Sequence, residues 1–251
     1  MEFYYLAEPP GLDGAVLFDK DESRHIVRSR RHRVGDRVFA VDGQGNRFLV
    51  ELSEADGHLV RGRVLDSARS VFEPRVSLTL AQGVLKGDRL AEVVTAAVQL
   101  GVNSVLPFKS ARTVGACGPA RVARLRKVAL EAMKSSRRAI WPEVSEPVGF
   151  GELVERSGEF DSVLVAWEQE NEQAFGDVLD RTVERVMLVI GPEGGFEEAE
   201  VGMFKQAGAK TFSLGPRPMR AELAGVVAVS ALLFALGEMM PASKCQDRKE
   251  V

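Results

Sequence analysis

From residue 76 onward, apolar runs of strand length alternate with longer helical patterns, and this alternation constrains the fold more than any other feature. Strands are expected at 76–81, 104–107, 162–166, 185–190 and 210–213, and helices at 88–100, 119–136, 197–207 and 223–236. The pattern predicts an α/β domain with a mostly parallel sheet covered on both faces. Because such sheets bind ligands at the carboxyl ends of their strands, a site is expected in the loops after Ala166, Ile190 and Leu214.

The segment before this alternation has a different character. Residues 33–65 contain three short β-type runs separated by turn residues, including Asp42-Gly43 and Asp56-Gly57. They predict a small antiparallel barrel or sheet. Pro74 interrupts the pattern, so we expect a first domain at 1–72 and a second at 73–251.

Cysteine usage and hydropathy favour a cytoplasmic protein. Cys117 and Cys245 are far apart and lack CxxC spacing, which argues against a disulfide framework or a cysteine zinc site. The N-terminal sequence MEFYYLAEPPGLDG lacks the basic and apolar regions of a secretory signal. The apolar stretch 223–236 is shorter than the roughly 20 residues of a membrane span, so a buried helix is expected there. The three histidines show no metal-ligand spacing, and no metal is expected.

The net charge of −3 conceals an uneven distribution. Residues 1–150 carry 23 basic and 18 acidic groups, whereas residues 151–200 carry 3 and 14. Arginines concentrate at 24–37 and 121–138. Such runs are either solvated faces or RNA-binding surfaces, because arginine suits both phosphates and unpaired bases.

The strongest local signal is MLVIGPEGGFEEAEV at 187–201. An apolar strand runs directly into Gly191-Pro192-Glu193-Gly194-Gly195 and then into an acidic helix start. Bare glycine backbone can wrap closely around a ligand, although a tight strand-to-helix connection without a ligand is the alternative. The GxxxxGK[ST] pattern of a Walker loop is missing.

A second signal, FSLGPRPMRAELAGVVAVSALLF at 212–234, places Arg217 and Arg220 in a turn before the apolar helix. Arginines there require an anionic or carbonyl-rich partner. That partner is either a ligand or simply the neighbouring Glu222.

Together with KGDRLAEVVTAAVQLGV at 86–102 and EAMKSSRRAIWPEV at 131–144, these motifs resemble the ribosomal RNA small-subunit methyltransferase E family of the SPOUT superfamily. The similarity covers nearly the whole chain. It implies a PUA-like β-barrel followed by a SPOUT domain with a C-terminal trefoil knot, which pattern reasoning alone would not propose. It also implies a homodimer that uses S-adenosyl-L-methionine to methylate uridine N3 in 16S rRNA of the small ribosomal subunit.

The resemblance assigns residues to three roles. The cofactor site would comprise Ala166, Trp167, Ile190, Gly191, Pro192, Glu193, Gly194, Gly195, Leu214, Gly215, Pro216 and Met219. Catalytic candidates are Arg220, Glu222 and Glu193. RNA would be bound by Arg24, His25, Arg28, Arg30, Arg31, Arg33, Arg137 and Arg138. The chain departs from the family pattern at Pro218, Leu223, Lys134 and Gln99.

We hypothesise that Arg220 stabilises charge developing on a uracil carbonyl, while Glu222 or Glu193 orients groups or receives the N3 proton. A binding-only ribosome-associated factor with a degenerate site is the alternative that the departures at Pro218 and Leu223 leave open. A dinucleotide enzyme would need GxGxxG after an early strand, and the chain has only Gly43-Gln44-Gly45 within a hairpin.

Overall fold

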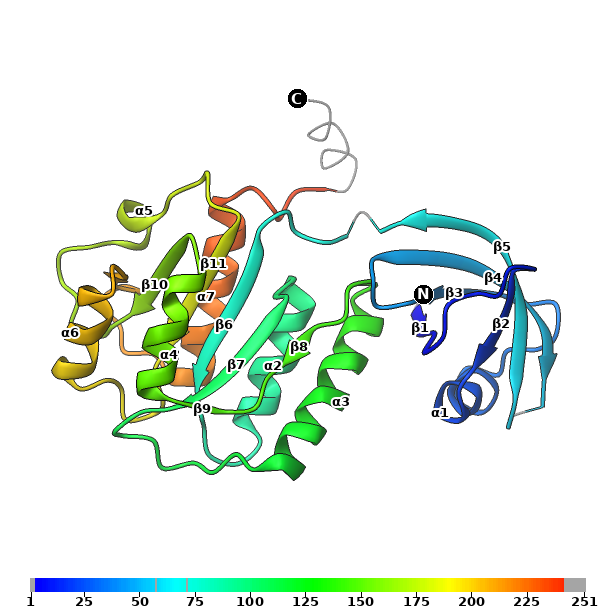
Figure 1. Cartoon of the computed structure of the whole chain (residues 1–251), viewed down its shortest axis with the longest axis horizontal. Coiled ribbons are helices and arrows are strands. Elements are labelled where there is room, and N and C mark those ends of the chain that lie inside the picture. Colours follow the sequence, from blue (N-terminus) through cyan, green and yellow to red (C-terminus); the bar gives the residue numbers. More distant parts are fainter. Residues whose placement is uncertain (1–2, 57, 71, 242–251) are drawn as a thin grey trace. The chain divides into compact units, whose positions relative to one another are not determined.

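A computed structural model describes residues 3–56, 58–70 and 72–241 of the chain, so Cys245 and the polar tail around it lie outside the described residues. The chain forms two compact units (Figure 1). The first unit contains the described residues up to Glu73 together with Met133–Trp141, and the second contains Pro74–Ala132 and the described residues from Pro142 onward. Met133–Trp141, assigned by sequence to the second domain, therefore makes its contacts in the first unit.

The first unit contains a five-stranded sheet. Its order is β1 (Phe3–Tyr5), β3 (Arg37–Val41), β4 (Asn46–Ala55), β5 (Val60–Arg69) and β2 (Ala15–Phe18). The three strands predicted within residues 33–65, which are β3, β4 and β5, pair antiparallel as expected. The additional strand β2 is antiparallel to β5, whereas β1 is parallel to β3. Between β2 and β3 lie the short helix α1 (Lys20–Arg24), which the Asp19 side chain caps, and the π-helix η1 (His25–Ser29).

Alternation along β4 explains the core of the first unit. Phe48, Val50 and Leu52 are buried, while the residues between them are more exposed. They pack with apolar side chains from other elements, including Phe18 and Ile26. Period-two alternation therefore gives this sheet one apolar face, as the sequence predicted.

Two buried ion pairs attach Met133–Trp141 to the rest of the first unit. Lys134 Nζ lies 2.6 Å from Glu22 Oε1, and both side chains are almost fully buried. Arg138 lies 2.8 Å from Glu73, whose carboxylate also accepts hydrogen bonds from the Ala139 and Ile140 backbone N–H groups. Because a buried carboxylate without such partners is costly, these contacts fix the path of the segment.

The second unit contains a parallel sheet. Its order is β12 (Lys210–Phe212), β10 (Ser162–Ala166), β11 (Arg185–Ile190), β6 (Ser77–Gly83), β7 (Ser104–Lys109) and β8 (Glu143–Val144), with β9 (Val148–Gly149) also paired to β7. Every neighbouring pair is parallel. The predicted α/β class with a parallel sheet is confirmed.

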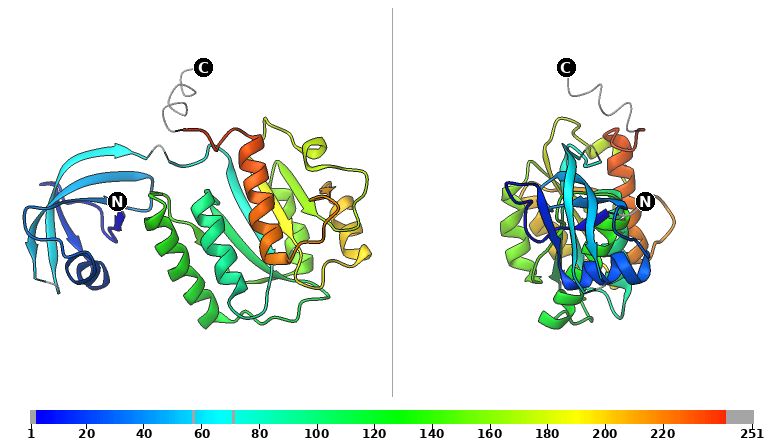
Figure 2. Two further views of the ribbon diagram at one scale, coloured as in Figure 1. Left: turned by 180° about the vertical axis from the view of Figure 1, so that it is seen from behind. Right: turned by 90° about the vertical axis from the view of Figure 1, so that its right-hand side faces the viewer.

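Helices cover both faces of this sheet. The helices α4 (Phe150–Arg156) and α6 (Glu198–Gln206) pack on one face, against Val163, Val165 and Val189 (Figure 1). On the other, α2 (Arg89–Leu100) and α7 (Ala221–Ala235) lie side by side against β6 and β11 (Figure 2). The remaining helices are α3 (Pro119–Ser135), α5 (Phe175–Val178) and the 3-10 helix η2 (Ser157–Glu159).

Strand register brings the carboxyl ends of four strands together. Ala166 is paired with Ile190 on one side and with Phe212 on the other, and Ile190 is paired with Gln82. The loops that follow β6, β10, β11 and β12 consequently emerge at one edge of the sheet. This is where a parallel sheet of this type binds its ligand.

The expectation of a buried helix at 223–236 is only partly correct. Gly225, Val229 and Leu232 of α7 are buried, whereas Leu223 is 52% exposed and Phe234 is 74% exposed. A helix that is apolar all round thus covers the sheet with one face only. Within the described residues, no helix combines the length and the apolar character that crossing a membrane requires.

The Lys134–Glu22 pair leads to a stability prediction. We expect Lys134→Met to lower the free energy of unfolding by about 3–5 kcal/mol, because Glu22 would remain buried without its cation. The double variant Glu22→Leu/Lys134→Met should recover most of this loss. Urea unfolding would measure both changes.

The exposed pair formed by Arg156 and Glu152 is a matched control, since both side chains are more than 40% exposed. Arg156→Met should cost at most about 0.5 kcal/mol. An equally small effect of Lys134→Met would mean that the buried pair does not stabilise the fold.

Candidate functional site

A pocket of about 870 Å³ opens at the carboxyl ends of β10, β11 and β12. All twelve residues predicted to bind the cofactor line this pocket, as do the three catalytic candidates Arg220, Glu222 and Glu193. Side chains from three separate loops and from the start of α7 therefore face one cavity. Its volume lies in the range typical of small-molecule sites.

The glycine loop, Gly191–Gly195, forms one wall. Gly195 adopts a φ of 69°, and its N–H donates a 2.9 Å hydrogen bond to the carbonyl of Pro192, which closes a tight turn. Gly83 of β6 lies directly against the loop: a Cβ there would contact the Pro192 nitrogen and come within 2.8 Å of the Gly191 carbonyl carbon. Close packing of the loop on β6 thus requires glycine at position 83.

The loop leads directly into α6, whose first turn is acidic as the sequence indicated. Glu197 is the N-cap residue, and Glu200 accepts a 2.9 Å hydrogen bond from the Glu197 N–H. The other oxygen of Glu200 accepts from the Ala111 N–H, from the loop after β7. These acids satisfy backbone donors at the positive end of the helix.

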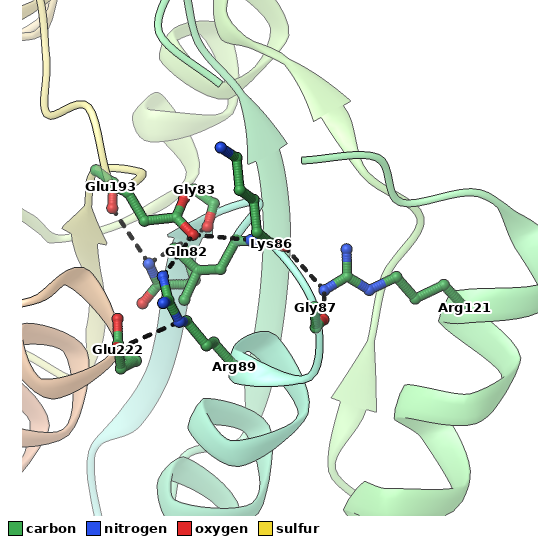
Figure 3. Close-up of polar contacts among 10 residues, drawn as sticks. Gln82, Gly83, Lys86, Gly87, Arg89, Arg121, Glu193 and Glu222 are labelled. Carbon is green, nitrogen blue, oxygen red and sulfur yellow. Dashed lines mark hydrogen bonds and ion pairs between the residues drawn. The ribbon is translucent and has the colours of Figure 1, made fainter. Parts of the chain in front are cut away.

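Arg89, at the first position of α2, lies between the carboxylates of the two catalytic candidates Glu193 and Glu222 (Figure 3). Its guanidinium is 3.3 Å from Glu193 Oε1 and 3.6 Å from Glu222 Oε1. The sequence suggested Arg217 or Arg220 as the partner of Glu222. Arg89 forms that pair instead, because α2 and α7 pack side by side and their first turns meet.

Glu193 is held as a carboxylate. Burial by itself raises the pKa of Glu193. The hydrogen bond from the Lys86 backbone N–H and the charge of Arg89 lower it by more, so the pKa lies below its ordinary value. A carboxylate stabilised in this way is a weak proton acceptor. Glu193 therefore suits a clamping role better than that of a base.

Two buried polar atoms in the pocket have no hydrogen-bond partner among the described residues: Trp167 Nε1 and Glu222 Oε2. One is a donor and the other an acceptor. Burying such groups unpaired is unfavourable, so a polar ligand that reaches both would gain affinity.

Glu170, which the sequence did not single out, organises the loop after β10. It accepts a 2.5 Å hydrogen bond from the Thr211 hydroxyl of β12 and further bonds from the Glu172 and Gln173 backbone. The Thr211 hydrogen bond is the main reason that its pKa is lowered. Glu170 also lines the pocket, and its bond to Thr211 joins the loop after β10 to β12.

Arg220 is the N-cap residue of α7, and its carbonyl accepts from the Leu223 and Ala224 N–H groups. Its side chain is exposed at the pocket and makes no ion pair with the described residues. The guanidinium is therefore available to an incoming group.

The basic segments separate into exposed and buried members. The predicted RNA-binding arginines of the N-terminal run are all exposed, namely Arg24, Arg28, Arg30, Arg31 and Arg33. His25, in the same run, is half-buried. Arg137 is also exposed. Arg138 is 2% exposed and paired with Glu73, so its prediction as an RNA contact is wrong. Arg121 bonds to the Ala116, Leu85 and Gly87 carbonyls and is likewise structural (Figure 3).

Sequence reasoning missed Arg89, although a signal was present. The site was expected in the loops after three strands, whereas Arg89 follows a fourth strand, β6, where Lys86-Gly87-Asp88-Arg89 leads into α2. In a parallel sheet, that loop emerges at the same edge. Over the described residues, no cluster of three or more metal-ligating side chains is found.

Fold and pocket together define a two-domain enzyme of the RNA methyltransferase class. Residues 72–233 match the RNA methyltransferase domain family, and residues 18–65 match the RNA methyltransferase PUA domain family. The chain is 30% identical to ribosomal RNA small subunit methyltransferase E of Bacillus subtilis, over 85% of this chain and 88% of that protein. It is 31% identical to the protein of the same name from Mycobacterium bovis, over 91% and 90%.

The chain therefore belongs to the ribosomal RNA small subunit methyltransferase E family. A solved structure of the Neisseria gonorrhoeae member, bound to S-adenosyl methionine, is 25% identical and superposes with a TM-score of 0.86, covering 94% of this chain and 98% of that one.

Contact between β6 and the glycine loop can be tested without a ligand. Gly83→Ala should lower the free energy of unfolding by about 1–3 kcal/mol, because the new methyl group meets backbone that cannot move aside easily. Backbone amides of the glycine loop should also exchange faster with deuterium.

Gly202→Ala, within α6 where a Cβ meets nothing within 4 Å, is the control. It should stabilise the chain slightly, because alanine is the better helix former. Unchanged exchange in Gly83→Ala would show that the loop tolerates displacement from β6.

Proposed function

We propose that this protein transfers a methyl group from S-adenosyl-L-methionine to N3 of a uridine in 16S rRNA of the small ribosomal subunit. The convergence of the predicted cofactor and catalytic residues on one pocket carries the proposal. The names of the curated relatives support the substrate class. Ribosomal RNA as substrate implies that the protein works in the cytoplasm.

The pocket's donor set fits the proposed cofactor. The loop after β10, the glycine loop and 214–219 would hold it, with the buried Trp167 Nε1 as an open polar donor. When bound, S-adenosyl-L-methionine supplies an electrophilic methyl group on sulfur. The bare glycine backbone allows close approach to such a ligand.

The protein's part in the reaction concerns charge and a proton. Uracil N3 carries a proton and becomes nucleophilic only as that proton leaves, when negative charge spreads to the flanking carbonyl oxygens. Arg220 would stabilise this charge, since its guanidinium is exposed at the pocket. Glu222, with one buried oxygen open, is better suited than Glu193 to receive the proton.

We further propose that the protein is a homodimer joined along α7. Leu223 and Phe234 lie on the same stripe of the helix as Val227 and Ser230, at the spacing of one helical face. Val227 and Ser230 are half-buried, whereas Leu223 and Phe234 expose large apolar side chains, as is typical of a subunit interface. A trefoil knot is proposed for the C-terminal segment, since β12 lies at the sheet edge whereas α7, next in the chain, returns to β6, β11 and α2.

The activity can be tested directly. Purified protein would be incubated with labelled S-adenosyl-L-methionine and small subunits from a strain lacking the enzyme, and nucleosides would be identified by mass spectrometry. We expect 3-methyluridine. In single turnover, Arg220→Ala should slow its formation about 10²–10³-fold, as removal of a charge-stabilising donor does.

Arg181→Ala, an exposed arginine away from the pocket, should react like the wild type. If the wild-type protein binds the cofactor but transfers no methyl group, a different RNA target is indicated. If the wild-type protein does not bind the cofactor, a binding-only factor is favoured. Normal transfer by Arg220→Ala would contradict its electrostatic role.

The dimer leads to a separate prediction. Sedimentation should give twice the chain mass, and Phe234→Asp should weaken dimerisation at least tenfold, because a carboxylate would be buried in an apolar interface. Val114→Asp, at a residue 72% exposed in the loop after β7, should leave the dimer intact. A monomeric wild type would overturn the proposal.

A further inference from the structure

A second cavity, of about 480 Å³, lies entirely within the first unit. Its lining includes Tyr4, Arg30, His32, Arg37, Phe39 and Arg137. Only Arg30 and Arg137 among these were expected to be functional from the sequence. The lining residues come from segments that are distant in the sequence, from Tyr4 to Arg137. No local sequence pattern could therefore have shown the cavity.

The lining combines cationic and aromatic groups. Arg30, Arg37 and Arg137 come from three separate segments, and each offers a planar fork of donors that matches phosphate. The half-buried ring of Phe39 and the Tyr4 ring, which meets His32 edge-on at 6.1 Å, supply apolar surface.

Two of the cationic lining residues pair with acids. Arg37 is 3.5 Å from Glu51, and His32 is 3.2 Å from Asp36. The Arg37–Glu51 pair is exposed on both sides, so an incoming anion can compete with Glu51 for the guanidinium. Arg37 therefore remains accessible to a negatively charged ligand.

Backbone conformation gives independent support. Arg137 has a φ of 62° at the end of α3, where its N–H and that of Arg138 donate to the carbonyls of Lys134 and Met133. This is the helix-ending arrangement in which glycine is the usual residue, because a side chain there is strained. An arginine at this position indicates that its side chain is needed in the cavity.

Arg31 shows the same feature, with a φ of 59° just after η1. The chain reverses there, and the residues on either side, Arg30 and His32, both line the cavity. Arg31 and Arg137 are the non-glycine residues with positive φ in the described part of the chain. Arg137 itself lines the cavity, whereas Arg31 lies between two residues that line it.

We propose that this cavity binds one unstacked nucleotide of the RNA substrate, with its phosphate held by Arg30, Arg37 and Arg137 and its base against Phe39. This inference rests on the proposed function for the identity of the RNA. Unpaired bases stacked on aromatic rings and arginine planes are the usual targets of RNA-binding proteins, and a pocket of this volume excludes a base-paired stretch. The site would anchor the RNA at a point other than the methylated base.

The decisive variant is Arg137→Gly in the full-length protein. Glycine relieves the left-handed backbone, so the melting temperature should stay the same or rise, whereas affinity for small-subunit RNA should fall about three- to tenfold. The slope of affinity against salt should decrease by about one, as expected for a lost phosphate contact. Unchanged affinity would overturn the proposal.

Arg37→Ala and Arg61→Ala form a matched pair. Both arginines are exposed on strands of the same sheet, and each pairs with a glutamate, Glu51 at 3.5 Å and Glu54 at 3.4 Å, but only Arg37 lines the cavity. Arg37→Ala should weaken RNA binding and Arg61→Ala should not. Equal losses would indicate a diffuse electrostatic effect and contradict a specific site.

Cross-linking would locate the bound base. RNA containing 4-thiouridine should form photo-adducts on peptides with Phe39, His32 or Tyr4, and adducts confined to other peptides would reject the site. Failure here is separable from failure of the proposed function. If the wild type makes 3-methyluridine and Arg137→Gly binds RNA normally, only the proposed role of the cavity is rejected. If RNA binding depends on the cavity residues but no methylation occurs, only the proposed reaction is rejected.

Discussion

The candidate site depends on one cation, Arg89, which separates two carboxylates from different parts of the chain. Glu193 belongs to the glycine loop and Glu222 to the first turn of α7, and the Arg89 guanidinium lies within 3.6 Å of both. Without this charge, two partly buried acids would repel each other and the loop would lose its link to the helix. The position of Arg89 is in turn set by α2, which packs against α7.

Strand register makes this arrangement possible. Because β6, β10, β11 and β12 are all parallel and Gln82, Ile190, Ala166 and Phe212 lie in register, four loops leave the sheet at one edge. Gly83 then allows the loop after β11 to rest on β6, which brings Glu193 to the Lys86 N–H. Ligand-binding geometry therefore follows from backbone packing before any side chain of the pocket is considered.

Periodicity and punctuation predicted the second unit well. The strands at 162–166 and 185–190 have the predicted bounds, since each is a short apolar run ended by a turn or a glycine. The twelve residues that the motifs predicted as a cofactor site all line one pocket. Contacts between distant segments could not be predicted in this way, because the Arg89–Glu222 and Arg138–Glu73 pairs join residues 133 and 65 positions apart. The strands β1 and β2 were also missed, because they are too short to show an alternation of apolar and polar residues.

Arginine composition alone could not distinguish structural from functional members of the basic runs. Arg138 and Arg137 are adjacent, yet Arg138 turns inward to Glu73 while Arg137 lines a cavity. The left-handed backbone at Arg137 reverses the chain at the end of α3 and sends the two side chains in different directions. An arginine that keeps this strained conformation, where glycine would be unstrained, is best explained by what its side chain reaches. Backbone outliers therefore identify functional arginines that a count of charges leaves mixed with the rest.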